Sequence, residues 1–170
     1  MLSIVQFFLG LAICFVLRLL PWRPPNVEPI TATLMPFSKR FGPAGGILFA
    51  FLSIVLFDAF TSGIGTWTWV TAGTFALIGG VASPILRSRK GSIPYVVYAI
   101  VATLFFDAVT GVAMSSLLFD MNWKEAAIGQ IPFTINHLLG NIVLAAVMSP
   151  LIERWVTENP RLKVGFLAKA

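Results

Sequence analysis

The sequence predicts an all-α membrane protein, a compact bundle of six transmembrane helices with both termini on the cytoplasmic side. The chain of 170 residues is 57% hydrophobic and only 11% charged, whereas a soluble domain carries about a quarter charged residues. Apolar runs close to the roughly 20 residues that cross a bilayer recur along it. Lys and Arg fall in short clusters between these runs. No long linker interrupts the pattern, so residues 1–170 are expected to form a single domain.

The first three expected helices occupy the N-terminal third of the chain. Residues 3–20 form an apolar span without a basic leader or a small-residue cleavage site, which favours a retained helix over a signal peptide. The stretch PWRPPNVEP, residues 21–29, then breaks the chain with four prolines. Residues 30–38 predict a short or tilted second helix. After KRFGP, residues 44–60 predict the third span.

Three further spans are expected in the remaining chain. Residues 66–86 predict the fourth span and residues 93–118 the fifth, separated by the basic segment RSRKGS. The segment FDMNWKEAAIGQ, residues 119–130, is expected to be a polar loop or a short interfacial helix. Residues 132–152 predict the sixth span, with Pro132 near its first turn.

Positive charge sets the expected orientation, because cytoplasmic loops of membrane proteins carry an excess of Lys and Arg. With the N-terminus inside, nine basic residues fall on the cytoplasmic side: Lys39, Arg40, Arg87, Arg89, Lys90, Arg154, Arg161, Lys163 and Lys169. Three fall outside: Arg18, Arg23 and Lys124. This dispersed placement of a net charge of +5 is typical of a membrane protein and argues against nucleic-acid binding.

Polar residues are expected to meet in the outer third of the bundle. Asp58 and Asp107 each lie fourteen residues past the start of a span that runs outwards, or about 21 Å from the inner face. His137 lies five residues into a span that runs inwards. A carboxylate in hydrocarbon costs roughly 2.5–3.5 kcal/mol on insertion scales, so these groups should face an interior or a water-filled cavity.

Helical spacing places these groups on polar stripes. Thr103, Asp107 and Thr110 share one face of the fifth span, and His137 and Asn141 share one face of the sixth. Each residue also has a structural interpretation. Asp58 can cap a helix end or pair with Arg18, and His137 can be an interhelical hydrogen-bonding residue. Trp67 and Trp69 can be interfacial belt residues.

Small residues predict close helix packing or a docking face for another membrane protein. The candidates for docking are Gly10, Cys14, Gly46 and Ala50. Cys14 is also the only cysteine, which excludes an intrachain disulfide and makes a metal cluster implausible.

Three segments carry a resemblance to a known family: PNVEPITA at residues 25–32, GIGTWTW at 63–69 and PFTINHLLGNIVLA at 132–145. Their order and spacing make the chain similar to the S component of an energy-coupling factor (ECF) vitamin transporter, and most similar to the cobalamin-type branch. The resemblance implies a prokaryotic cytoplasmic-membrane subunit that binds a vitamin from outside. It also implies a transmembrane T component, two cytosolic ATPases, no catalytic activity and no cofactor or metal.

The resemblance implies a ligand pocket in the outer half, formed by Asn26, Trp67, Trp69, Asp107, His137 and Asn141. Thr110 lies on the same stripe, and the Asn26–Glu28 segment would act as a lid. In the family, an Ala-x-x-x-Ala pattern on the first helix contacts the T component. Here Gly10-x-x-x-Cys14 stands in its place, which leaves the docking face open.

Two other functions fit parts of the pattern. Asp58, Asp107 and His137 could form a proton relay in an intramembrane carrier. The pattern FDA-x-T occurs twice, at residues 57–61 and 106–110. Both copies lie on predicted helices that run in the same direction rather than on an inverted repeat, which argues against a standalone carrier. A structural membrane scaffold would explain the small-residue faces but does not require a buried polar cluster. The sequence does not name the ligand.

Overall fold

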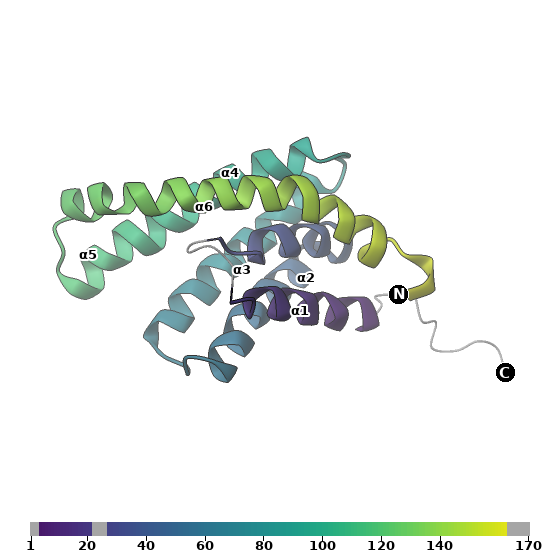
Figure 1. Cartoon of the computed structure of the whole chain (residues 1–170), viewed down its shortest axis with the longest axis horizontal. Helices are drawn as coiled ribbons and strands as arrows, with labels where there is room; N and C mark the ends of the chain where they lie inside the picture. The colour runs from purple at the N-terminus through teal and green to yellow at the C-terminus, as the bar shows by residue number, and fades with distance from the viewer. Residues whose placement is uncertain (1–3, 22–26, 163–170) are drawn as a thin grey trace.

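The computed structural model describes residues 4–21 and 27–162, in which helices joined by short turns are present and no strand occurs (Figure 1). The α-helices are α1 (Ile4–Arg18), α2 (Ile30–Phe60), α3 (Thr66–Leu86), α4 (Ile93–Asp107), α5 (Met114–Phe119) and α6 (Trp123–Ile152). A π-helical segment, η1 (Ala108–Ala113), joins α4 to α5. Another, η2 (Glu153–Thr157), extends α6, and the short 3-10 helix η3 (Pro160–Leu162) follows.

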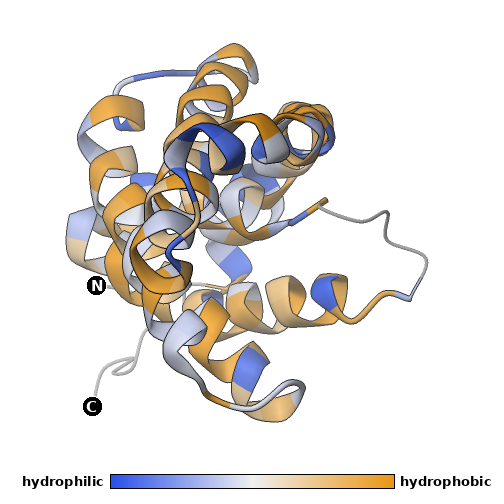
Figure 2. Ribbon diagram, turned by 90° about the vertical axis from the view of Figure 1, so that its left-hand side faces the viewer, coloured by the Kyte–Doolittle hydropathy of each residue, from blue (hydrophilic) through white to orange (hydrophobic). Residues whose placement is uncertain are grey.

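The helices suit a membrane in length and composition. Four stretches of the described residues can cross a bilayer: Ile30–Phe60, Thr66–Leu86, Ile93–Phe119 and Trp123–Thr157. The shorter helix Ile4–Arg18 is also apolar. Apolar residues lie on every helix in Figure 2, and large ones such as Phe60, Ile93 and Leu117 are more than 70% exposed. Such exposure is explained by lipid contact, and it identifies an integral membrane protein.

A sharp bend divides α2 into two arms. Gly42 has a positive φ of 79°, which L side chains rarely adopt, and Pro43 follows it. Phe37 and Phe49 stack with ring centroids 4.4 Å apart, although twelve residues of straight helix would separate them by about 18 Å. The chain therefore folds back on itself, and the two arms correspond to the separately predicted helices at residues 30–38 and 44–60.

Small residues bring α2 and α3 into backbone contact. A Cβ atom on either Gly46 or Gly79 would collide with the carbonyl group of the other. The Ser38 hydroxyl strengthens this contact by donating a hydrogen bond to the Gly79 carbonyl. Close approach of this kind is how small residues promote helix association in lipid.

The expected docking residues are used inside the chain. Gly46 lies against α3, Ala50 is fully buried, and Cys14 is 1% exposed. A Cβ atom on Gly10 would collide with the Phe37 ring. None of the four presents a surface to a partner, because the small side chains are needed for packing between α1, α2 and α3.

The C-terminal half corrects one boundary. Residues 119–130 are predicted to be a polar loop or a short interfacial helix, but most of them belong to the long helix α6, which begins at Trp123. The Asn122 side chain caps this helix by accepting a hydrogen bond from the Lys124 amide at 2.9 Å. Pro132 therefore lies inside the helix rather than in its first turn. The predicted fifth span is one continuous helical rod formed by α4, η1 and α5. The π-helical segment η1 in its middle is not predicted by the sequence. In Figure 1, α6 runs along α4.

A network of polar contacts holds the helices together at the end of the bundle where α4 begins. The Glu153 carboxylate pairs with Lys39 at 2.5 Å and accepts a hydrogen bond from the Tyr95 hydroxyl at 2.9 Å. The buried Gln6 side chain donates to the Val156 carbonyl at 2.7 Å. These contacts join α1, the first arm of α2, α4 and η2.

The α2–α3 contact predicts unequal effects for two substitutions on one helix. Gly79→Ala should lower the free energy of unfolding by about 1–3 kcal/mol, because its methyl group meets backbone rather than a flexible side chain. Gly73→Ala is the matched control, since a Cβ there meets nothing within 4 Å, and it should be neutral or slightly stabilising. Thermal unfolding in detergent measures both, and equal effects would contradict the packing described.

Candidate functional site

The site is built on the seam where α4 lies along α6. Asp107 closes α4 and His137 lies mid-way along α6, with Oδ1 of Asp107 and Nδ1 of His137 2.8 Å apart. The two side chains are only 3% and 2% exposed. A buried carboxylate needs a partner of this kind. The two polar stripes expected on these helices therefore do meet.

A second rung lies one helical turn away. Asn141 is four residues after His137, and Thr103 is four residues before Asp107. The Asn141 Nδ2 group donates a hydrogen bond to Thr103 Oγ1 at 2.8 Å. Both side chains are buried, at 1% exposure each. The seam thus carries two parallel polar contacts between the same two helices.

Three polar atoms of the seam have no hydrogen-bond partner among the described residues. They are Oδ2 of Asp107, Nε2 of His137 and Oδ1 of Asn141, and all three are buried. Buried polar atoms are nearly always hydrogen-bonded, and each exception requires an explanation. These unpartnered atoms on Asp107, His137 and Asn141 make the seam the candidate site, although Oγ of Ser116, outside the seam, is also buried without a partner.

Aromatic rings flank the polar pair. Phe106 and Phe133 present themselves to the His137 ring in edge-on geometry, with centroids 5.7 and 5.5 Å away. Phe75 of α3 packs against Phe106 at 4.4 Å. These phenylalanines were not among the predicted site residues. Phe133 could have been found from its position one helical turn before His137.

Val27 packs against α6 at Gly140, where a Cβ atom would lie 2.7 Å from a Val27 methyl group. Gly140 directly precedes Asn141, so Val27 lies near the second rung along α6. The predicted lid residue Asn26 lies outside the described residues.

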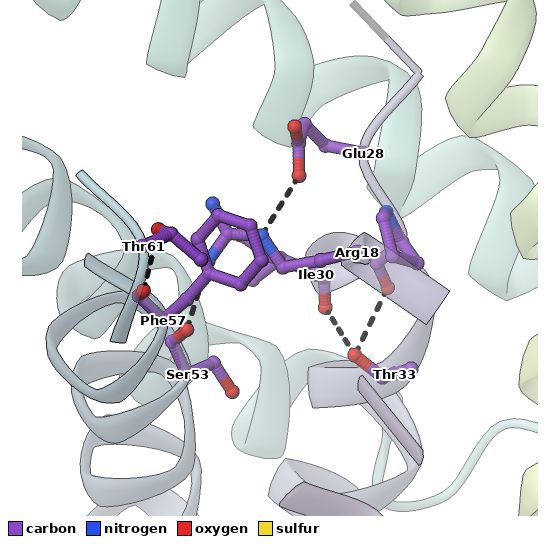
Figure 3. A network of polar contacts seen from close by, with 8 residues as sticks. Arg18, Glu28, Ile30, Thr33, Ser53, Phe57 and Thr61 are labelled. Atoms are coloured by element: carbon purple, nitrogen blue, oxygen red, sulfur yellow. Dashed lines mark hydrogen bonds and ion pairs between the residues drawn. The ribbon is translucent and has the colours of Figure 1, made fainter. Parts of the chain in front are cut away.

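Arg18 joins Glu28, just before α2, to the second arm of α2 (Figure 3). Its Nε lies 3.1 Å from Oε2 of Glu28, its Nη1 donates to the Ser53 carbonyl at 2.9 Å, and its guanidinium lies 3.7 Å from the Phe57 ring centroid. Arg18 thus pairs with Glu28 rather than with Asp58.

The tryptophans do not lie together. Trp67 is 41% exposed and packs near Phe119 of α5, with ring centroids 6.4 Å apart. Trp69 is 53% exposed and lies 6.2 Å from Phe51 on the second arm of α2. Two positions apart on a helix, they point in nearly opposite directions. Only Trp67 lies on the side of α3 that faces α5.

The side chains of Thr110 and Asp58 form local hydrogen bonds rather than hydrogen bonds to the residues of the seam. The Thr110 hydroxyl donates to the Phe106 carbonyl at 2.8 Å, so it bonds within its own helix. Asp58 accepts a hydrogen bond from the Thr68 hydroxyl at 2.7 Å, and its backbone carbonyl accepts from the Gly63 amide at the same distance. Asp58 therefore organises the turn that leads to Trp67 and does not join the seam.

Comparisons with known proteins agree with this architecture. The family described as "ECF-type riboflavin transporter, S component" matches residues 1–154. The chain is 27% identical to a UPF0397 protein of Leuconostoc citreum (strain KM20) over 172 residues, covering 94% of this chain and 89% of the relative. No solved structure matches. The matched family carries riboflavin in its name, and the similarity to a cobalamin-type branch is not supported.

S components are membrane-embedded subunits that bind the substrate of a transporter driven by separate T and ATPase subunits. The buried polar seam, the apolar outer surface and the family match over nearly the whole chain agree on this role. The chain belongs to the S-component family of ECF-type riboflavin transporters, and it is a transport subunit rather than an enzyme.

Proposed function

We propose that this chain captures a vitamin-class small molecule, with riboflavin favoured, from the outer face of a prokaryotic cytoplasmic membrane. The observation that carries the proposal is the set of three buried, unpartnered polar atoms on the α4–α6 seam. A purely structural scaffold has no need of such atoms, since leaving a buried polar group unpaired costs about 1–3 kcal/mol. The family name supports riboflavin as the molecule that pairs with them.

The proposed topology has six membrane crossings with both termini inside. They are α1, the two arms of α2, α3, the rod from α4 to α5, and α6. The bias of Lys and Arg supports this orientation, because Lys39, Arg40, Arg87, Arg89 and Lys90 gather where α3 ends and α4 begins. Asp107 and His137 then lie in the outer half, within reach of a ligand arriving from outside.

Capture would combine ring contacts with hydrogen bonds. Trp67, Phe106 and Phe133 would contact a ring system, while Asp107, His137 and Asn141 would bond its polar groups. The connection anchored by Arg18 and Glu28 would close over the ligand, with Asn26 contributing from the same segment. Trp69 and Thr110, which point elsewhere or bond within their helix, would support the site only indirectly.

Energy for uptake would come from partner subunits. The sequence lacks the G-x-x-x-x-G-K-[ST] loop that binds nucleotide phosphates. A T component and two cytosolic ATPases, as in ECF transporters, would supply ATP hydrolysis. Because Gly10, Cys14, Gly46 and Ala50 are buried, the T component would contact other residues of α1 to α3.

The alternative of a proton-coupled carrier is less well supported. A relay would need Asp58 to communicate with Asp107 and His137, yet Asp58 bonds Thr68 across the α2–α3 turn. Asp107 and His137 bond each other instead. Two separate hydrogen-bonded pairs match a binding site and a structured turn better than a proton pathway.

Retention of riboflavin tests the proposed function. Wild-type protein purified with riboflavin should retain it through size-exclusion chromatography, as measured by flavin fluorescence and mass spectrometry. Asp107→Asn should weaken binding at least about tenfold, because a hydrogen bond to a charged group contributes about 1.5–3 kcal/mol. Asp120→Asn makes the same chemical change at an exposed position in the α5–α6 connection and should have no effect. Failure of the wild type to bind riboflavin would contradict the ligand assignment.

A double-mutant cycle separates the binding site from a relay. Asp107→Asn and His137→Gln should show a coupling free energy of about 1 kcal/mol in detergent unfolding, within the range found for hydrogen bonds between membrane helices. Asp58→Asn and His137→Gln should be additive. Strong coupling in the second cycle would instead favour the relay.

A further inference from the structure

We propose that the α4–α6 seam binds the hydroxyl-bearing chain of the ligand, and that the ring system lies outside the seam against the flanking aromatic side chains. The inference deepens the proposed function and rests on it. For riboflavin, the hydroxyl-bearing chain is the ribityl group and the ring system is the isoalloxazine.

The first step is the hydrogen-bonding character of the three unpartnered atoms. Oδ1 of Asp107 is occupied by His137, which leaves Oδ2 as an acceptor. In the tautomer of His137 that carries its hydrogen on Nδ1, that nitrogen donates to the carboxylate and the lone pair of Nε2 is a further acceptor. Asn141 uses Nδ2 toward Thr103, which leaves Oδ1 as a third acceptor. The seam therefore requires hydrogen-bond donors from its ligand.

The two polar parts of a flavin, the pyrimidine edge and the ribityl chain, differ in the number of hydrogen bonds that they can donate. The pyrimidine edge of the ring offers a single N–H flanked by two carbonyls, so it would bring acceptors against acceptors. A ribityl chain carries hydroxyls on consecutive carbons beyond the CH2 that joins it to the ring, and every hydroxyl can donate. Phosphate or carboxylate groups are excluded because they would lie against the Asp107 carboxylate in a low-dielectric site.

The third step is the arrangement along the seam. The two rungs, Asp107–His137 and Thr103–Asn141, are one helical turn apart, or about 5.4 Å. A flexible chain with consecutive hydroxyls can satisfy acceptors at both levels.

The fourth step places the ring. Phe106 and Phe133 already pack edge-on against His137, and Phe133 is 36% exposed. A flat heteroaromatic system would gain contact area there, because aromatic pairs favour offset or edge-on packing. Val27 packs against Gly140 near the second rung, and we expect the chain to enter from the aromatic side.

Analogue binding to the wild-type chain tests this orientation without any substitution. Equilibrium titration uses riboflavin, lumiflavin, in which a methyl group replaces the ribityl chain, and N3-methylriboflavin, in which the ring N–H is methylated. N3-methylriboflavin should bind within about threefold of riboflavin. Lumiflavin should bind at least about 30-fold more weakly, since it lacks every donor that the seam would receive.

Binding of the same flavins to substituted proteins tests whether the weaker binding of lumiflavin arises at the seam. Asp107→Asn should weaken riboflavin binding at least about tenfold and leave lumiflavin binding unchanged, while Asp120→Asn should change neither. The elution profile and melting temperature of each variant verify that it is folded, and Asn141→Leu serves as a second seam variant with the same expected selectivity.

Distinct outcomes overturn the inference and the proposed function. If riboflavin binds but lumiflavin binds equally well, or if N3-methylation abolishes binding, the ring rather than the chain occupies the seam. Equal weakening of both flavins by Asp107→Asn would also overturn the inference. If the wild type binds no flavin, the proposed ligand itself is wrong, and this inference fails with it.

Discussion

A carboxylate inside a hydrocarbon-embedded bundle must have a partner, and the site depends on how Asp107 meets that requirement. Its Oδ1 lies 2.8 Å from Nδ1 of His137, which holds α4 against α6. The second rung, between Thr103 and Asn141, follows in register one turn away. At the far end of the same helices, Glu153 binds Lys39 and Tyr95. Polar contacts thus determine how the C-terminal half of the bundle assembles.

The N-terminal half is held by a different mechanism. There, Gly46 and Gly79 allow α2 and α3 to touch backbone to backbone, and Phe37 and Phe49 stack across the bend at Gly42. This packing is so close that a larger side chain at Gly46 or Gly79 would collide with the neighbouring backbone. The seam, by contrast, retains three unpartnered polar atoms. Such a division is expected where a binding site sacrifices stability that the rest of the fold supplies.

Much of this arrangement is predictable from sequence because membrane helices obey simple rules. The lengths of the apolar runs predicted where the helices lie. Helical spacing predicted that Asp107 lies on one polar stripe and that His137 and Asn141 lie on another. The π-helical segment η1 has no sequence signal of that kind. The start of α6 at Trp123 was missed because its first turns are polar and Pro132 resembled a helix start.

Pairing between distant residues was harder to predict than position. Depth alone put Arg18, Asp58 and Asp107 at one level, but it does not choose partners. Arg18 binds Glu28, which lies just before α2, and Asp58 binds Thr68 because a tight turn brings α3 back beside α2. Trp67 and Trp69 looked like a pair in sequence, yet two positions on a helix face opposite ways. The small residues predicted to dock a partner are consumed by packing within the chain.

His137 is the only histidine in the chain, so its imidazole nitrogens can be observed directly by ¹⁵N NMR of histidine-labelled protein. The central claim is that Nε2 of His137 accepts a hydrogen bond from the ligand while Nδ1 keeps its bond to Asp107. Saturation with riboflavin should therefore shift the Nε2 resonance and leave the Nδ1 resonance nearly unchanged. If both resonances stayed in place at saturation, the seam would not be the binding site.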